Sequence, residues 1–485
     1  MTDGRVPINI LDPGDGGLTR GGVIGHLAIA DAWLVDPVSG RSGRGSIVIE
    51  DGRITELEWA PASASGPSPS VVVAPSFIDI RAHIREPGAE EGESFASGLE
   101  AAAHGGFGFV ASMADTRPVV DRPEVVQRVL AAGAASGSPV RTRPYAAVTI
   151  GREGTNLAGF ASLAAAGVVG FSDLPAATTD AAMLRAALSE AGGLGMPIVI
   201  QPDEPSLTAG AEANEGLPST ILGLRGASAA AEVSAVSRAV AVLRQVSAEV
   251  PPDVRPHLHI AHLSAAGSLD PVRAARAEGL RVTCDVAAHH LALHDGWLGG
   301  DRRWSWEAAS SPWAGAQAGD PAPYHPGTRL DPPLRGPEDA IALIAALEDG
   351  TIDAIASDHA PALAVDVQRP FGEAVAGMSS LETTLGLVLE TVDSGRLSLV
   401  RAMRALSLGP WRALDGGRIE LPEPSLRVGA EANLVIFDRA DHWIVDDVML
   451  RSRGRNTPLL GRSLPGRVLL TIARGRLAWQ DPDLD

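Results

Sequence analysis

The sequence predicts an α/β protein, a (β/α)8 TIM barrel accompanied by a small β-sandwich. The 485 residues exceed one small domain and fit a barrel of about 250–350 residues with a second, smaller unit. From Pro75 onward, apolar strand-like runs alternate with helix-like stretches, which is typical of a parallel sheet covered by helices. Both ends of the chain carry β patterning instead, which predicts the sandwich.

The N-terminal segment, residues 1–74, is expected to form the first part of the sandwich. Residues 1–25 are rich in Gly, Pro and Asp and predict an irregular arm. Alternating apolar runs between residues 27 and 54, with a tight turn near their end, predict hairpin strands. Residues 61–70 form a low-complexity stretch and are expected to be a loop.

The middle segment, residues 75–414, is expected to form the barrel. Between its apolar runs lie stretches such as Asp121–Ala132, with Asp121 as a candidate N-cap, and Ser228–Val246, both helix-like. An open doubly wound sheet is the alternative, but no Gly-x-Gly-x-x-Gly follows the first run. The eight runs end near His83, Met113, Ile150, Asp173, Gln201, His262, Cys284–Val286 and Asp358.

Two later stretches complete the organisation. Residues 287–336 are too many for a plain connection and predict a lid or an interface. After a helical stretch at 397–408, β patterning returns at 433–437 and 467–472. We therefore expect residues 415–485 to complete the sandwich.

Composition excludes several classes of partner and chemistry. The formal charge, 40 basic minus 59 acidic residues, is −19, which disfavours nucleic acid and anionic membranes. A single cysteine, Cys284, cannot form an internal disulfide and suggests a reducing cytoplasm. No leader and no apolar run of about 18 residues is evident, so a soluble cytoplasmic protein is expected. All basic residues are arginine, which excludes a carboxylated lysine bridge and a Schiff base.

Polar residues follow several of the predicted barrel strands. Because the carboxyl ends of barrel strands share one mouth, we expect these side chains to face a common pocket. Two histidines and two aspartates there would suit zinc or a similar ion acting on water. Each alone is more often a hydrogen-bonded core or loop residue, whereas four together favour a site. The set is Arg81, His83, Arg85, Asp115, Asp173, Gln201, His262 and Asp358.

Several motifs in order along the chain carry a resemblance to a known family. They are Arg85-Glu86-Pro87-Gly88, Met113-Ala114-Asp115-Thr116-Arg117-Pro118, Gly151-Arg152-Glu153-Gly154, Phe171-Ser172-Asp173, His262-Leu263-Ser264, Asp331-Pro332-Pro333-Leu334-Arg335, Asp358-His359-Ala360-Pro361 and Gly454-Arg455-Asn456-Thr457-Pro458. From about Leu27 to Leu477 the chain resembles dihydroorotases of the cyclic amidohydrolase family. Allantoinases and dihydropyrimidinases share the barrel, but the segments at Asp115 and Asp331 are more similar to dihydroorotase.

The resemblance implies a metal site, and the sequence departs from it. The implied ligands are His83, Asp173, His262 and Asp358. Arg81 and Gln201 stand where the family has two further histidines. Arginine stays protonated and has no lone pair to give, and a neutral amide oxygen is a poor zinc ligand. We expect no cofactor, with zinc bound only if the remnant site is functional.

The implied substrate-binding residues also depart from the family. The residue matched by Arg85 holds the substrate carboxylate in the family, helped by an asparagine and a histidine. Here Asp115 and Ala362 replace these two helpers. An aspartate beside an anionic substrate adds like-charge repulsion. The residues that we predict at the substrate-binding position are Arg85 and Asp115.

Three functions follow from the resemblance. The first, which the losses favour, is a catalytically inactive subunit that assembles with the aspartate transcarbamoylase catalytic subunit in pyrimidine biosynthesis, as a homo-oligomer or mixed oligomer. The second is an active zinc-dependent dihydroorotase with Asp358 as general base. The third is a protein that binds an anion such as dihydroorotate through Arg81 and Arg85 without hydrolysing it.

Arg81 can replace the metal electrostatically. Without an ion, Asp173 and Asp358 are expected to repel each other, and the planar guanidinium could bridge both carboxylates. Alternatively, Arg81 swings out to solvent. The other histidines, His257, His259, His289 and His290, are expected to be structural or to anchor the 287–336 stretch.

Overall fold

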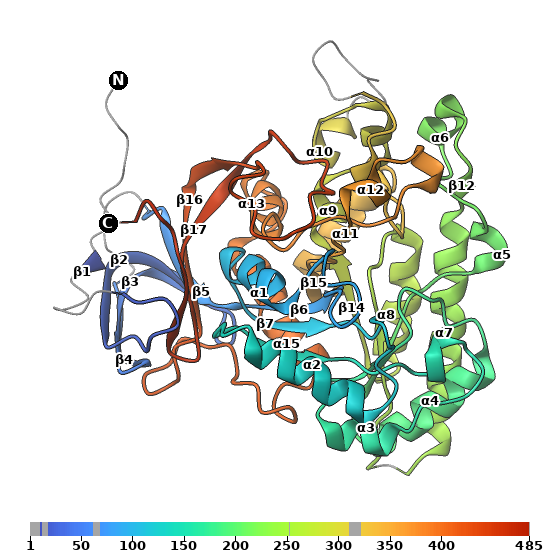
Figure 1. Cartoon of the computed structure of the whole chain (residues 1–485), viewed down its shortest axis with the longest axis horizontal. Helices are drawn as coiled ribbons and strands as arrows, with labels where there is room; N and C mark the ends of the chain where they lie inside the picture. The colour runs from blue at the N-terminus through green and yellow to red at the C-terminus, as the bar shows by residue number, and fades with distance from the viewer. Residues whose placement is uncertain (1–9, 12–17, 62–67, 252, 310–321, 485) are drawn as a thin grey trace.

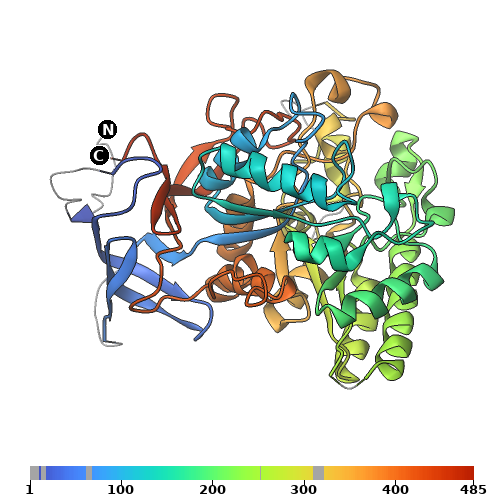
Figure 2. The same cartoon turned by 60° about the horizontal axis from the view of Figure 1, so that its bottom comes forward.

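The computed structural model describes residues 10–11, 18–61, 68–251, 253–309 and 322–484. Most of the predicted arm at 1–25 and of the loop at 61–70 lies outside these residues. Figure 1 shows the strands from both chain ends on one side of the molecule and a barrel wrapped by helices on the other. Figure 2 shows the same division from a second direction.

Eight parallel strands form the barrel, so the (β/α)8 prediction is confirmed and the open doubly wound sheet is wrong. Neighbouring strands pair in parallel within two groups, β6 to β8 and β9 to β15. Single parallel bridges, Ala146 to Phe171 and Ala82 to His359, join the groups and close the ring. The strands are β6 (Phe77–Ala82), β7 (Phe107–Ser112), β8 (Arg141–Pro144), β9 (Phe171–Ser172), β10 (Pro197–Ile200), β13 (His257–Ile260), β14 (Val282–Ala287) and β15 (Ala354–Ala356).

Helices cover the outside of the barrel. The larger ones are α1 (Phe95–His104), α2 (Pro123–Ala135), α3 (Phe160–Ala166), α4 (Ala181–Gly193), α7 (Ala229–Glu249), α8 (Leu269–Ala277), α11 (Pro337–Asp349), α13 (Thr384–Asp393), α14 (Leu399–Leu406) and α15 (Leu408–Ala413). Short elements around the mouth are α5 (Pro205–Thr208), β11 (Ala213–Asn214), α6 (Leu217–Leu222), β12 (Gly226–Ala227) and α12 (Ala364–Val367). In the described part of the chain no helix is long and apolar enough to cross a membrane.

Two predicted details of the barrel are wrong at residue level. Arg122, not Asp121, is the N-cap of α2, because the Asp121 carboxylate instead accepts a hydrogen bond from Gly151 N–H at 2.9 Å. The third strand ends at Pro144 rather than near Ile150, because Ile150 begins a 3-10 turn. Helix α7 does start after Ser228, as predicted, and continues to Glu249.

The strands from the two chain ends form one eight-stranded sheet beside the barrel. Its order is β18-β17-β16-β5-β2-β3-β4, with β1 paired to β2. Strand β5 joins the halves, because it pairs antiparallel with β16 and parallel with β2. The sheet folds around its own core, which includes Leu27, Ile47, Ile436 and Ile472. The strands are β1 (Ile10–Leu11), β2 (His26–Asp36), β3 (Arg41–Glu50), β4 (Arg53–Trp59), β5 (Val71–Pro75), β16 (Leu434–Ile444), β17 (Ser463–Ala473) and β18 (Arg476–Gln480).

The predicted fold class, a TIM barrel with a β-sandwich built from the two chain ends, is thereby confirmed. The predicted domain boundaries, 1–74, 75–414 and 415–485, stay predictions. The 287–336 stretch contains α9 (Ala288–Ala292), a 3-10 turn at Asp295–Gly299, α10 (Ser305–Ala308) and a turn at Pro326–Thr328. Trp297 in it is fully buried. This stretch is packed onto the barrel in its described part, and its role as a lid or an interface stays a prediction.

Helix α15 lies against the start of β15 and requires a glycine at the contact. A Cβ atom added at Gly409 would lie 1.8 Å from the carbonyl oxygen of Asp353. Both partners are backbone, so the contact cannot be relieved by rotating a side chain. The close approach therefore depends on the missing side chain.

We predict that Gly409→Ala lowers the free energy of unfolding by about 1–3 kcal/mol, because the backbone must move to admit the methyl group. Chemical denaturation of the purified variant measures this. Gly193→Ala is the matched control, since no atom lies within 4 Å of a Cβ added there. Equal stability of the two variants would contradict the close approach of α15 to β15.

Candidate functional site

The predicted polar residues all lie at or just beyond the carboxyl ends of barrel strands. Arg81 belongs to β6, and Asp358 follows β15. The seam between these two strands sets their relative position. Ser357 donates hydrogen bonds to Asp79 from its N–H at 2.9 Å and its hydroxyl at 2.6 Å, and His83 N–H donates to His359 O at 2.7 Å.

The Arg81 guanidinium lies between two carboxylates inside the barrel. Its Nε donates to Asp358 Oδ1 at 2.9 Å, and its Nη1 donates to both oxygens of Asp285, at 2.8 and 2.9 Å. The side chain is 1% exposed, so the alternative in which it swings out to solvent is wrong. This geometry is the charge-assisted fork that arginine forms with carboxylates.

The second carboxylate that Arg81 binds is Asp285. The prediction that Arg81 bridges Asp173 and Asp358 is therefore wrong. Asp173 is bound elsewhere: it accepts from Val148 N–H at 2.8 Å, Thr149 N–H at 3.1 Å and the Thr149 hydroxyl at 2.6 Å. Its carboxylate therefore stabilises the turn after β8. The three hydrogen bonds satisfy a partly desolvated group.

Asp285 was not identified from the sequence because it lies within β14, two residues before the strand ends. A single charged residue within a largely apolar strand is the signal that identifies it. His259 Nε2 lies 2.8 Å from Asp285 Oδ2, and His262 N–H donates to Oδ1 at 3.0 Å. Together with Arg81, these partners satisfy a carboxylate that is 1% exposed.

Electrostatics keep this cluster ionised. Burial alone would raise the pKa of both carboxyls, but the charge of Arg81 outweighs it, lowering the pKa of Asp285 to about 2 and that of Asp358 well below its ordinary value. Burial lowers the pKa of Arg81, and the two carboxylates more than reverse that effect. Burial also lowers the pKa of His289 to about 4, so its ring is neutral at pH 7.

A divalent metal does not fit the arrangement of these residues. Arg81 Nε donates to Asp358 Oδ1 at 2.9 Å, and its positive charge would repel a divalent ion bound to the same carboxylate. Asp173 is held by Thr149. His262 retains two buried ring nitrogens without hydrogen-bond partners, and its Nδ1 lies 3.6 Å from Asp358.

Gln201 occupies the other position where the family has histidine. Its side chain hydrogen-bonds Asp331, whose pKa is raised chiefly by burial and is lowered in part by His262 and Gln201. The Gln201 carbonyl oxygen is buried without a partner. A cavity of about 30 Å³ lies beside these two residues. Gln201 is therefore a neutral hydrogen-bonding residue of the pocket wall.

A second cluster lies beside β6 and β7. His83 Nδ1 and Asp115 Oδ2 are 2.8 Å apart, and Arg85 Nη1 donates to the same oxygen at 3.1 Å. Burial opposes ionisation of Asp115, but His83 and Arg85 outweigh it and hold the pKa of this carboxyl well below its ordinary value. Arg85 also donates from Nε to Pro361 O at 3.2 Å. The arginine predicted to bind a substrate carboxylate thus already has a carboxylate partner.

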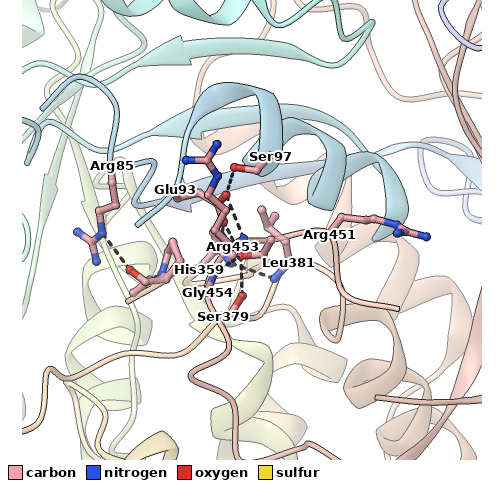
Figure 3. A network of polar contacts seen from close by, with 12 residues as sticks. Arg85, Glu93, Ser97, His359, Ser379, Leu381, Arg451, Arg453 and Gly454 are labelled. Carbon is pink, nitrogen blue, oxygen red and sulfur yellow. Dashed lines mark hydrogen bonds and ion pairs between the residues drawn. The ribbon is translucent and has the colours of Figure 1, made fainter. Parts of the chain in front are cut away.

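His359 is a structural residue of the Asp358-His359-Ala360-Pro361 motif. Its Nδ1 accepts from Ser380 N–H at 3.1 Å and Leu381 N–H at 3.4 Å, which leaves Nε2 to donate to Glu93 at 3.3 Å. Glu93 is fully buried and also accepts from the Ser452 hydroxyl. Figure 3 shows this network joining α1, the loop after β15 and the C-terminal segment. It fixes the loop that carries Asp358.

Solved structures with the same fold are cyclic amidohydrolases. The L-hydantoinase (dihydropyrimidinase) of Arthrobacter aurescens superposes with a TM-score of 0.73 at 20% identity, covering 93% of this chain and 96% of its own. A D-hydantoinase (dihydropyrimidinase) of Thermus sp. gives a TM-score of 0.71 at 19% identity, covering 94% and 95%. The fold is therefore that of the hydantoinases.

Comparison of amino-acid sequences identifies one family among the proteins with this fold. The "Dihydro-orotase-like" family model matches residues 70–265. A protein of Anaeromyxobacter dehalogenans named dihydroorotase is 36% identical over 463 residues, 95% of this chain and 99% of its own. One of Pelotomaculum thermopropionicum with the same name is 37% identical over 460 residues, 94% and 99%. The chain belongs to the dihydroorotase family.

We predict that Arg81→Met lowers the free energy of unfolding by about 3–5 kcal/mol at neutral pH, because two carboxylates inside the barrel lose their cation. Thermal or chemical denaturation measures the loss. Arg44→Met, which breaks an exposed ion pair with Asp31, is the control and should leave stability unchanged. If the free energy of unfolding is unchanged in Arg81→Met, the buried contacts of Arg81 with the two carboxylates do not stabilise the fold.

The loss should depend on pH with a defined sign. In the wild type the pKa of Asp285, about 2 against an ordinary 3.8, gives a stabilisation that is complete above about pH 4 and is lost as the pH falls towards 2. Without Arg81, burial raises the carboxyl pKa values, so the variant loses stability as the pH rises. The difference between the two proteins should therefore shrink on acidification from pH 7 to about pH 4, and a constant difference would contradict this explanation.

Proposed function

We propose that this chain is a dihydroorotase-like subunit that does not hydrolyse cyclic amides. The observation that supports this is the ion pair of Arg81 with Asp358 at 2.9 Å. Arg81 stands at a position where the family resemblance implies a histidine ligand. Its guanidinium neutralises Asp358, the one carboxylate of the implied ligand set that it contacts.

The proposal also follows from what Asp358 can do chemically. A general base works best when its pKa lies near the working pH. Arg81 holds the pKa of Asp358 well below its ordinary value, despite the opposing effect of burial. A carboxylate so stabilised in its ionised form is a weak acceptor for the proton of an attacking water.

Substrate orientation is impaired in the same pocket. Arg85 donates to Asp115, so a substrate carboxylate would have to displace an internal one. Ala362 carries no ring where the family resemblance implies a histidine, and its N–H donates to Asn456 Oδ1 at 3.0 Å. Catalysis by positioning needs both groups. Arg81 is buried and binds two carboxylates through its Nε and Nη1, which also disfavours the function in which it binds an anionic ligand.

The partner proposed for such a subunit is the aspartate transcarbamoylase catalytic subunit, in a cytoplasmic assembly that includes homo-oligomers of this chain. Its support is the family resemblance, because some members that have lost metal ligands assemble with that enzyme. In this role Arg81 preserves a stable barrel.

The second candidate is an active metal-dependent dihydroorotase. It is favoured by the relatives named dihydroorotase, which match more than nine-tenths of the chain. His83, Asp173, His262 and Asp358 remain from the implied ligand set. This function requires Arg81 to leave Asp358 and Asp173 to leave Thr149.

Metal content and turnover decide between the two candidates. We predict that the wild type, purified with zinc present, contains far less than one metal per chain and does not hydrolyse dihydroorotate. Arg81→His with Gln201→His should restore zinc binding. Adding Asp115→Asn and Ala362→His should be needed for hydrolysis, because orientation of the substrate is a separate requirement. Stoichiometric metal with ordinary turnover in the wild type would establish the second candidate.

Mass in solution tests the partner. We predict that the wild type and the aspartate transcarbamoylase catalytic subunit of the same organism co-elute as one complex in light-scattering chromatography. An unrelated hydantoinase of the same fold is the control. Separate elution at micromolar concentrations would remove the proposed partner without affecting the proposal on hydrolysis.

A further inference from the structure

A cavity of about 140 Å³ lies at the amino-terminal end of β15, between α11, α14 and α15. It is remote from the mouth, because Asp353 in its wall precedes β15 whereas Asp358 follows the same strand. Three arginines line it, Arg401 and Arg404 from α14 and Arg412 from α15. This is an unusual concentration of positive charge in a chain of net charge −19.

The carboxylate in the cavity wall, Asp353, offsets the charge of these arginines only in part, through its effect on Arg404. Asp353 forms an ion pair with Arg276 and accepts from Cys284 N–H at 2.9 Å. Nearby on α11, Glu348 accepts from Ser398 N–H at 2.8 Å, and Asp349 forms an ion pair with Arg273 at 3.1 Å. The acidic groups around the cavity are therefore engaged outside it.

The three guanidinium groups have no carboxylate partner of their own. Across the residues that the structure describes, neither Arg401, Arg404 nor Arg412 forms an ion pair. Arg404 donates to the carbonyl oxygen of Pro37 at 3.2 Å, a neutral acceptor. Burial and then the charges of Arg412 and Arg401 lower the pKa of Arg404, and Asp353 opposes them in part.

The cavity walls are closely packed. Helices α14 and α15 both pack against β15, and Gly409 fits against Asp353 only because it lacks a side chain. Helix α11 ends at Gly350 in a left-handed turn with φ 84°, and Arg401 Nη1 lies 3.5 Å from a Cβ added there. The carbonyl end of α11 compensates part of the Arg401 charge, and Pro37 O and Asp353 compensate part of the Arg404 charge.

We propose that this cavity, hereafter the arginine cavity, binds a phosphate group, either as free phosphate or on a small phosphorylated molecule. Arginine binds such oxyanions with several N–H donors at once. The cavity of about 140 Å³ has the volume of several water molecules, since a water takes about 30 Å³ in the liquid. A phosphate group therefore has room in it. Arg412 is exposed, so the arginine cavity is open to ligands from solvent.

Isothermal titration of the full chain with inorganic phosphate, at constant ionic strength in chloride buffer, tests the proposal. The wild type should bind one phosphate per chain. Arg412→Gln and Arg401→Gln should each weaken binding by at least about tenfold, since each removes a charged hydrogen-bond donor, and the double variant should show no binding. A parallel titration with glycerol phosphate distinguishes the two sources: tighter binding than phosphate indicates a phosphorylated molecule, and weaker binding indicates free phosphate.

Two controls make the result specific. Arg396→Gln makes the same charge change at an exposed residue that only contacts Ser394 O, and it should bind phosphate as the wild type does. Arg85→Gln alters the barrel mouth and should also leave phosphate binding unchanged. Absence of binding by the wild type at millimolar phosphate, unchanged binding by the double variant, or loss of binding in Arg85→Gln would each overturn the proposal.

Discussion

The contact of Arg81 with Asp285 and Asp358 is the interaction on which the centre of this barrel depends. Two ionised carboxylates with 1% and 12% exposure would be strongly unfavourable without a cation between them. The guanidinium supplies that cation together with three directed hydrogen bonds. The barrel therefore has a positive charge at its centre, and this charge is provided by a residue of the chain itself, Arg81.

This contact requires the closed barrel. Arg81 reaches Asp285 and Asp358 only because β6 lies next to β15 and β15 pairs with β14. The same seam orders the loop after β15, through Asp79 on one side and the Glu93–His359 network on the other. The same seam therefore positions the Arg81 salt bridge and the loop that carries Asp358.

Identity with the relatives extends over nearly the whole chain, 36% over 463 residues for one of them, and the fold is retained. A few residues of the pocket nevertheless depart from the pattern that the family resemblance implies. Arg81 stands where the family resemblance implies a histidine, and a protonated guanidinium has no lone pair to give to a metal ion. Asp115 likewise converts Arg85 from a free cation into a paired one. Function in this family must therefore be argued from the site rather than from the fold.

The sequence alone determined the architecture and most of the pocket. Alternating and continuous apolar runs predict strands, because successive side chains of a strand point to opposite faces and are buried on one face or on both. Polar residues at strand ends predict the mouth of the barrel, because parallel strands end on the same side. Only the tertiary structure decided which carboxylate meets Arg81. Asp173 and Asp285 are equally plausible along the chain, and the choice depends on local hydrogen bonds from Thr149 and on the register of β14. The arginine cavity is likewise a tertiary feature, because α14 and α15 carry arginines that become neighbours only when both helices pack on β15.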